Sequence, residues 1–150
     1  MAHCQEVAHG QTAERMVEQS QVIRSSSDVV LVRQLVRTQA EQLRLTDLER
    51  VKAVTAASEL ARNTLIHGGG GRADVQVIRA GSRRGIRMIF TDEGPGIADL
   101  EQALTDGYST GDGLGLGLPG ARRLVSEFAI VTSHAGTVIT AVIWESHGSR

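Results

Sequence analysis

The sequence predicts an α+β fold, a two-layer sandwich in which helices cover one face of a mixed β-sheet. Two observations support this class. Consecutive helical patterns at 28–43 and 46–65 precede two alternating apolar segments, and a further helix pair precedes two more. Helices and strands therefore come in runs rather than in strict alternation, which is typical of α+β proteins. A chain of 150 residues is long enough to bury one such core.

The N-terminal part begins without a recognisable element. Residues 1–20 are polar and aperiodic, and we expect a flexible extension that precedes a domain spanning 21–150. Gln21–Arg24 is expected to form a short strand. Asp28 is the expected N-cap of a helix that ends near Leu43. Its apolar face would consist of Leu31, Val32, Leu35 and Val36.

The second helix carries the clearest start and stop signals in the chain. Thr46 and Glu49 have the spacing of a capping box. Gly68–Gly71 cannot continue a helix and should end it. The apolar face between these signals would consist of Val51, Val54, Ala57, Leu60, Ala61 and Leu65.

The second half of the chain predicts a hairpin, two short helices and a final strand pair. Gly81–Gly85 would join a strand with Val75, Val77 and Arg79 to a strand with Ile86, Met88 and Phe90. A turn at 92–96 would follow, then a helix at 99–104, a glycine-dense loop at 107–118 and a helix from Pro119 to about Phe128. Ala129–Ser133 and Thr137–Trp144 would form the last two strands.

Composition excludes several functional classes. Sixteen cationic and 17 anionic side chains give a net charge of −1, so we expect no nucleic-acid partner. No apolar run approaches the ~20 residues that span a bilayer, so we expect no membrane partner. The single cysteine cannot form an intrachain disulfide, and we expect a cytoplasmic protein. Lys52 is the only lysine and does not follow a glycine, which excludes a P-loop.

The loop before the last predicted helix is rich in alternating glycines. Gly115, Gly117 and Gly120 match G-x-G-x-x-G, but no βαβ unit surrounds them, so a dinucleotide-binding interpretation is disfavoured. Glycines that lead into a helix start expose backbone N–H groups and let a polyphosphate approach closely. The alternative for such a loop is a flexible surface segment.

Two further segments carry side chains that are suited to nucleotide chemistry. Glu59 and Asn63 lie four residues apart on one helix face, where a carboxylate can take a proton and an amide oxygen can bind Mg²⁺. Asp92 ends an apolar strand before Gly94 and Gly96, and its carboxylate could accept a hydrogen bond from the amino group of adenine. Each pattern alone is more often a solvated helix face or a simple turn. Arg62 and His67 are interpreted as surface groups.

In this order the segments resemble the GHKL (Bergerat) ATP-binding fold of gyrase, Hsp90 and histidine-kinase ATPase domains. Residues 59–63 resemble its N box, 92–96 its first glycine box and 113–118 its second, and the likeness extends over about 21–144. Within the fold, 58–63, 107–110 and 117–120 resemble the RsbT/RsbW group of bacterial partner-switching kinases, RsbT most closely. The four glycines at 68–71 exceed what is usual after an N box.

The resemblance implies ATP and Mg²⁺ as cofactors and transfer of phosphate to serine or threonine. Asn63 would bind Mg²⁺, Glu59 would act as the base on the acceptor hydroxyl, and Asp92 would bind adenine with support from Thr137. Gly94 and Gly96 would let the adenine approach the backbone closely. The phosphates would be bound by Gly113, Gly115 and Gly117, and further nucleotide contacts would come from Ser109, Thr110 and Leu116.

The same resemblance implies a protein partner. The expected substrate is a STAS-domain protein, either RsbS- or RsbR-like or an anti-sigma antagonist, and the expected alternative partner is a phosphatase or a sigma factor. Two other functions stay open: an anti-sigma factor or ATP-dependent binding module, and the catalytic half of a sensor histidine kinase. The latter would need a helix with a phosphoacceptor histidine, which is not seen before residue 21.

Overall fold

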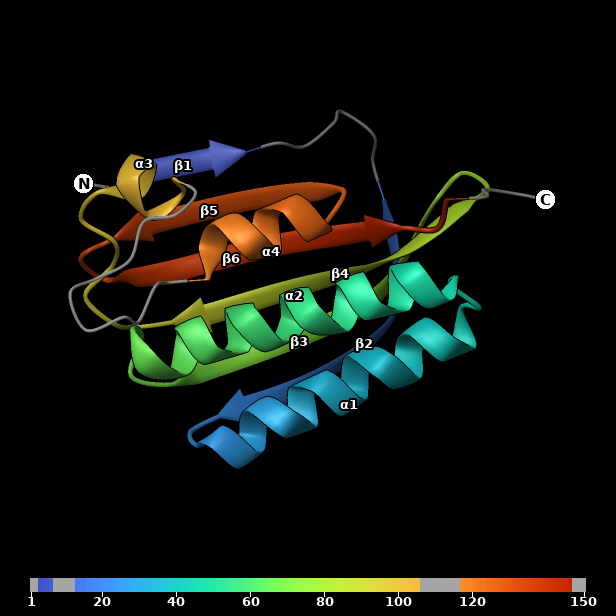
Figure 1. Cartoon of the computed structure of the whole chain (residues 1–150), viewed down its shortest axis with the longest axis horizontal. Coiled ribbons are helices and arrows are strands. Elements are labelled where there is room, and N and C mark those ends of the chain that lie inside the picture. The colour runs from blue at the N-terminus through green and yellow to red at the C-terminus, as the bar shows by residue number, and fades with distance from the viewer. Residues whose placement is uncertain (1–2, 7–12, 106–116, 147–150) are drawn as a thin grey trace.

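The computed structural model describes residues 3–6, 13–105 and 117–146, which form a sheet covered on one face by helices (Figure 1). The strands are β1 (His3–Glu6), β2 (Glu14–Ile23), β3 (Gly71–Ala80), β4 (Arg83–Asp92), β5 (Glu127–Ser133) and β6 (Gly136–Trp144). The helices are α1 (Ser26–Gln42), α2 (Asp47–Ile66), α3 (Leu100–Ala103) and α4 (Leu118–Leu124). The two-layer α+β class is thus confirmed.

The sheet is antiparallel throughout its described strands, so the expectation of a mixed sheet is wrong in that detail. Its order is β1-β5-β6-β4-β3-β2, and each of the five neighbouring pairs is antiparallel. The connection from β4 to β5 through α3 and α4 does not make those strands neighbours. Because β6 lies between them and opposes both, no parallel pair arises.

The core lies between the helices and the facing side of the sheet. The alternating residues predicted for the hairpin are buried there: Val75, Val77, Ile86, Met88 and Phe90. In the helices α1 contributes Val32 and Val36, while α2 contributes mainly alanines and Leu60, which let it pack closely on the sheet. Two expected core residues are wrong, because Leu31 and Val51 are 44% and 57% exposed.

The helix starts show one confirmed cap and one misplaced cap. In α2 the Glu49 N–H donates to Thr46 Oγ1 at 3.1 Å and the Thr46 N–H donates to Glu49 Oε1 at 2.8 Å, as the capping box predicts. In α1 the N-cap is Ser25, three residues before the expected Asp28. Asp28 instead lies in the first turn and accepts a hydrogen bond from the Arg24 N–H at 2.8 Å.

The expectation of a flexible segment up to residue 20 is wrong for residues 3–6, which form β1 and pair with β5, and for residues 14–20. Residues 14–20 belong to β2, which pairs with β3 and ends at Ile23, so the short strand expected at 21–24 is the end of a ten-residue strand. Polar pairs join the two strands: Ser20 with Asp74, Gln76 with Glu18 and Arg79 with Glu14. β2 lies at the edge of the sheet, where backbone pairing and polar contacts can hold a strand. Its sequence therefore does not need the alternation of apolar residues that identifies a buried strand.

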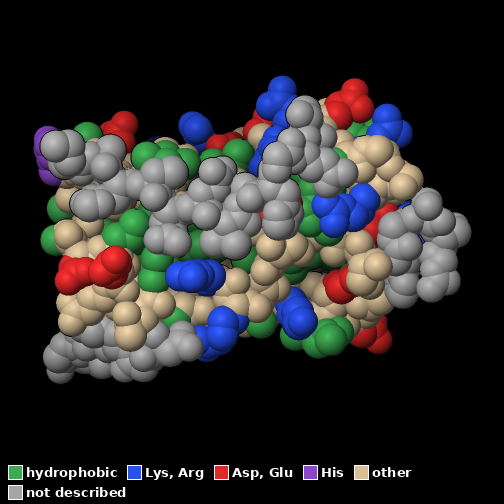
Figure 2. Space-filling model, turned by 90° about the horizontal axis from the view of Figure 1, so that it is seen from above, with side chains coloured by type: hydrophobic (Ala, Val, Ile, Leu, Met, Phe, Trp, Pro, Cys, Tyr) green, Lys and Arg blue, Asp and Glu red, His purple; other side chains and the backbone are tan. Residues whose placement is uncertain are grey.

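The remaining elements follow the predictions within a few residues. Asp99 caps α3 by accepting from the Gln102 N–H at 3.0 Å. α4 ends at Leu124 rather than near Phe128, because β5 already begins at Glu127. On the face seen in Figure 2, basic and acidic side chains are interspersed, in keeping with the small net charge. Within the described ranges no helix is long and apolar enough to cross a membrane.

Candidate functional site

One face of α2 presents a row of polar side chains toward the start of α4. Glu59 and Asn63 are one helical turn apart, and Asn63 is only 4% exposed. Gly117, the N-cap of α4, has a φ of 73° and packs against Glu59: a Cβ at this position would lie 2.5 Å from Glu59 Oε1. The left-handed backbone and this close contact both favour glycine. The structure therefore brings together the expected base, the expected metal ligand and one glycine of the second glycine box.

Asp92 lies at the end of β4, where it is 8% exposed. Its neighbours across the sheet are Gly71 in β3 and Thr137 in β6. Asp92 Oδ1 accepts a hydrogen bond from the Gly94 N–H at 2.9 Å. Burial raises the pKa of the Asp92 carboxyl above its usual value, although the backbone N–H groups of Gly94 and Thr137 act in the opposite direction. A buried carboxylate with few protein partners can accept a hydrogen bond from the amino group of a nucleotide base.

Three glycines pack closely around Asp92 and the end of α2. A Cβ on Gly68 would collide with the Asp92 carboxyl, and one on Gly136 would collide with the Asp92 carbonyl oxygen. A Cβ on Gly94 would lie 2.8 Å from Gly68 Cα. Gly68, which the resemblance leaves unexplained, thus has a structural reason: it lets the end of α2 touch Asp92. Sequence reasoning missed Gly68 as a site residue, although the four-glycine run was the available signal.

Gly96 has a φ of 82°, and a Cβ there would collide with the carbonyl oxygen of Ser133. Internal packing is therefore a sufficient reason for glycine at both Gly94 and Gly96. Their expected part in letting adenine approach stays a prediction.

Substitution of Gly68 by alanine is expected to lower the thermal stability and to displace the Asp92 carboxyl. The added methyl has no room beside that side chain, and overpacking of this kind costs about 1–3 kcal/mol. Gly120→Ala is the matched control, because an added Cβ there meets nothing within 4 Å and alanine favours helix. Thermal unfolding of both variants checks this expectation. Equal melting temperatures for Gly68→Ala and wild type would show that Asp92 is not confined by the glycine.

Thr137 is buried and engaged within the protein. Its hydroxyl lies 2.8 Å from the hydroxyl of Thr132 in β5, and Thr132 Oγ1 also accepts from the Ile97 N–H at 3.0 Å. Thr132 thus ties the segment after the first glycine box to the strand pair β5–β6. No sequence signal singles out Thr132, because its role depends on strand pairing across a hairpin.

The two halves of the site are joined by the C-terminal end of α2. Helix α2 runs from Glu59 and Asn63 to His67, its C-cap, and then to Gly68 beside Asp92. His67 was interpreted as a surface group, but it is only partly exposed. Its Nε2 atom is shielded from solvent and finds no hydrogen-bond partner among the residues that the structure describes. Five expected nucleotide contacts lie outside the described residues: Ser109, Thr110, Gly113, Gly115 and Leu116.

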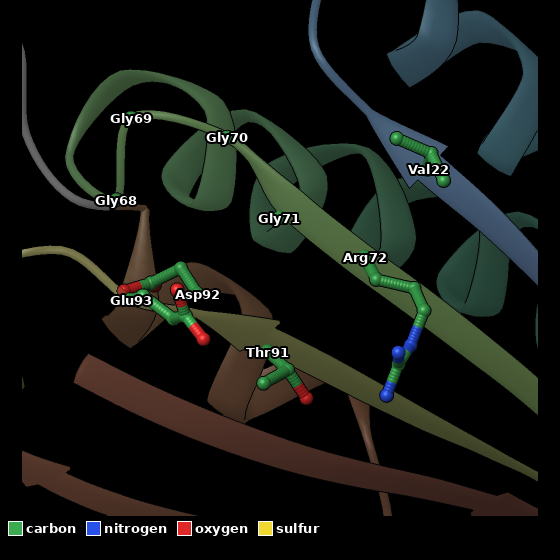
Figure 3. A pocket seen from close by; sticks show the side chains of 9 residues that line it. All are labelled: Val22, Gly68, Gly69, Gly70, Gly71, Arg72, Thr91, Asp92 and Glu93. Carbon is green, nitrogen blue, oxygen red and sulfur yellow. The ribbon is translucent and has the colours of Figure 1, made fainter.

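A cavity of about 480 Å³ opens beside Asp92 (Figure 3). It is lined by Val22, Gly68–Gly71, Arg72, Thr91, Asp92 and Glu93. Thr91 alternates with the buried Phe90 and so projects from the sheet face opposite α2. Because Glu59, Asn63 and Gly117 do not line it, this cavity adjoins the Asp92 end of the site and is not the place for a triphosphate chain.

The described residues offer few donors for a metal ion. In the described part of the chain no group of three or more histidine, cysteine, aspartate or glutamate side chains could hold a metal. A single amide oxygen, such as that of Asn63, is sufficient for Mg²⁺ when phosphate oxygens and water complete its shell.

Comparisons with known proteins agree with this geometry. Residues 24–143 match the family model described as the histidine kinase-like ATPase domain. The serine/threonine-protein kinase RsbT of Bacillus subtilis (strain 168) is 39% identical over 118 residues, which cover 78% of this chain and 89% of that protein.

Solved structures show the same fold at lower identity. The RsbU and RsbW domains of Rv1364c from Mycobacterium tuberculosis align with a TM-score of 0.60 at 21% identity, over 85% of this chain and 32% of that one. The catalytic domain of the histidine kinase ThkA aligns with a TM-score of 0.53 at 16% identity, over 87% and 97%. These two likenesses concern the fold alone.

Proposed function

The chain belongs to the RsbT/RsbW family of serine/threonine-protein kinases with a histidine kinase-like ATPase domain, and from this premise we propose that it phosphorylates a STAS-domain partner. The γ-phosphate of ATP would pass to a serine or threonine of that partner in a bacterial partner-switching pathway. The observation that carries the proposal is the continuous path along α2, from Glu59 and Asn63 to the buried Asp92.

Asp92 and Thr137 would hold the adenine end of ATP. The Asp92 carboxylate is an acceptor that can take a hydrogen bond from the exocyclic amino group of adenine. Its position is fixed by Gly68, by the Gly94 N–H and by the pairing of β4 with β6. Thr137, held by Thr132, would support the base from the neighbouring strand.

Asn63 would hold Mg²⁺ through its side-chain oxygen, and the metal would neutralise charge on the phosphates. The same neutralisation can come from backbone N–H groups at the start of α4, whose N-cap is Gly117. Phosphoryl transfer proceeds through a loose transition state, so positioning and charge stabilisation supply most of the rate. This is how a chain whose only lysine, Lys52, does not belong to a P-loop could catalyse the reaction.

Glu59 would accept the proton of the acceptor hydroxyl. It lies one turn before Asn63 on the same face of α2 and touches Gly117 at the start of α4. This position places a carboxylate near the phosphate end of the site, away from Asp92. The acceptor side chain would enter beside it.

Asn63→Ala is expected to abolish phosphotransfer and to weaken the binding of Mg·ATP much more than the binding of metal-free ATP. The reason is that alanine removes the proposed metal ligand while it preserves the helix, in which it is the most favourable residue. Calorimetric titrations with Mg²⁺ and with EDTA measure the difference, and thermal unfolding confirms the fold. An equal loss under both conditions would show that Asn63 does not bind the metal.

The proposed function is tested with the purified chain, γ-labelled ATP and the STAS-domain proteins of the source organism. A sigma-factor capture experiment runs in parallel. Labelling of a STAS protein supports the kinase proposal. ATP-dependent capture of a sigma factor without any labelled STAS protein would contradict it and would favour an anti-sigma factor.

A further inference from the structure

A second cavity, of about 240 Å³, lies between the end of α3 and α4. It is lined by Leu104, Pro119, Arg122 and Arg123. Two of these side chains are apolar and two are cationic, and none of the described residues that line the cavity is acidic. The cavity beside Asp92 is different, because two carboxylates and one arginine line it. The lining between α3 and α4 therefore suits an anionic group that is attached to apolar carbons.

The two arginines lie in the last turn of α4, and both are exposed. Within the described ranges, carboxylates form ion pairs with other arginines, namely Arg15, Arg50, Arg72, Arg79 and Arg84. Arg122 takes part in none of these pairs. The planar guanidinium group matches the geometry of a carboxylate and can donate two parallel hydrogen bonds to it. Arg122 can therefore pair with a carboxylate that comes from another molecule.

The cavity lies close to the proposed position of phosphate transfer. Gly117, the N-cap of α4, touches Glu59, and Arg122 follows Gly117 by five residues, or about 7.5 Å along a helix axis. Helix α4 packs beside α2 on the same face of the sheet (Figure 1). A protein interface of ordinary size covers about 800 Å² of each partner, which is a patch with a radius of roughly 16 Å. A protein whose hydroxyl reaches Glu59 would therefore also cover this cavity.

We propose that the cavity between α3 and α4 binds an aspartate or glutamate side chain of the protein substrate, close to the acceptor serine or threonine. Before transfer the acceptor carries a hydroxyl and no phosphate, so the anionic groups of an unmodified protein are its carboxylates. The carboxylate would pair with Arg122, and its methylene groups would pack on Leu104 and Pro119. The inference rests on the proposed function, to which it adds a docking contact that positions the acceptor beside Glu59.

Steady-state phosphotransfer at saturating Mg·ATP tests the contact, because it separates kcat from the KM for the STAS-domain partner. We expect Arg122→Glu to raise this KM roughly 5- to 30-fold with an unchanged kcat, since attraction is replaced by repulsion. Arg122→Lys keeps the charge but loses the planar fork, so its KM should lie between the two. Arg37→Glu is the matched control and should behave as wild type, because Arg37 is an exposed arginine of α1 that does not line the cavity.

A charge exchange then identifies the group on the partner. Each acidic residue near the acceptor of the partner is replaced by lysine, one at a time. One of these variants should be a poor substrate for the wild-type kinase and a better one for Arg122→Glu. The reason is that the second combination restores the ion pair with its signs reversed.

A wild-type KM for Arg122→Glu would overturn the inference. An equal rise in KM for Arg37→Glu would also overturn it, because the effect would then be one of overall charge. A weaker calorimetric affinity of Arg122→Glu for Mg·ATP would place Arg122 on the nucleotide instead. Thermal unfolding shows whether the end of α4 tolerates the change, since a cation in the last turn of a helix is favourable. A wild type that phosphorylates no STAS-domain protein would contradict the proposed function and this inference with it, whereas a phosphorylated partner with unchanged KM contradicts the inference alone.

Discussion

Glu59→Gln is expected to slow phosphotransfer about 100-fold while ATP affinity stays near the wild-type value. A general base contributes about 10²–10⁴-fold, and the low end applies here because a loose transition state demands little of the base. Glutamine has the size of glutamate, so the contact with Gly117 and the start of α4 is retained. The charge and the proton acceptor are lost.

The rate of single-turnover phosphate transfer from ATP to the unmodified STAS-domain partner measures this effect, and calorimetry measures the ATP affinity. Glu127→Gln is the matched control, because Glu127 lies in β5 and accepts from Trp144 Nε1, away from α2. A wild-type single-turnover rate for Glu59→Gln would reassign Glu59 to a structural role.

Asp92→Asn is expected to weaken ATP binding by about 5- to 150-fold, the equivalent of roughly 1–3 kcal/mol for a mismatched buried polar pair. The amide presents N–H donors where adenine also presents a donor. Because asparagine has the same size, it still fits beside Gly68, so the loss should not come from unfolding. Calorimetry with ATP checks this expectation, and an unchanged affinity would remove Asp92 from the adenine site.

In the nucleotide-free protein, the same variant is expected to gain stability relative to wild type as the pH rises. Burial raises the pKa of Asp92 in the folded state, so the folded protein binds this proton more readily than the unfolded chain does. The corresponding stability is present below the unfolded pKa and is lost as pH rises through the folded pKa. The stability of Asp92→Asn relative to wild type should therefore increase from acidic to neutral pH. Unfolding curves across that range test the sign.

The sequence predicted those helices and strands whose formation depends on residues close together in the chain. The capping box of Thr46 and Glu49, the hairpin that buries Val75 and Met88, and the short helix after Asp99 need only neighbouring residues, and each is confirmed. Only the end of β2 was predicted, because the polar side chains of its first part are satisfied by β3, which follows far later in the chain. Its partners could not be inferred from a window of sequence.

Motif spacing proposed Glu59, Asn63 and Asp92 as site residues, and their roles toward a nucleotide stay predictions. The spacing did not give their arrangement in space. It did not show that Gly68 packs on Asp92, that Thr132 holds Thr137, or that His67 has a buried nitrogen. These relations arise where the end of a helix meets the end of a sheet, and they depend on tertiary packing rather than on local propensity.

Transfer of phosphate to a STAS-domain protein is the central step, and the most direct measurement is mass-spectrometric mapping of the acceptor after reaction with Mg·ATP. The expected result is phosphate on a defined serine or threonine of one STAS protein, absent with Asn63→Ala and formed about 100-fold more slowly with Glu59→Gln. Folded wild-type protein that binds Mg·ATP but leaves every STAS-domain protein of the source organism unphosphorylated would contradict the proposed function.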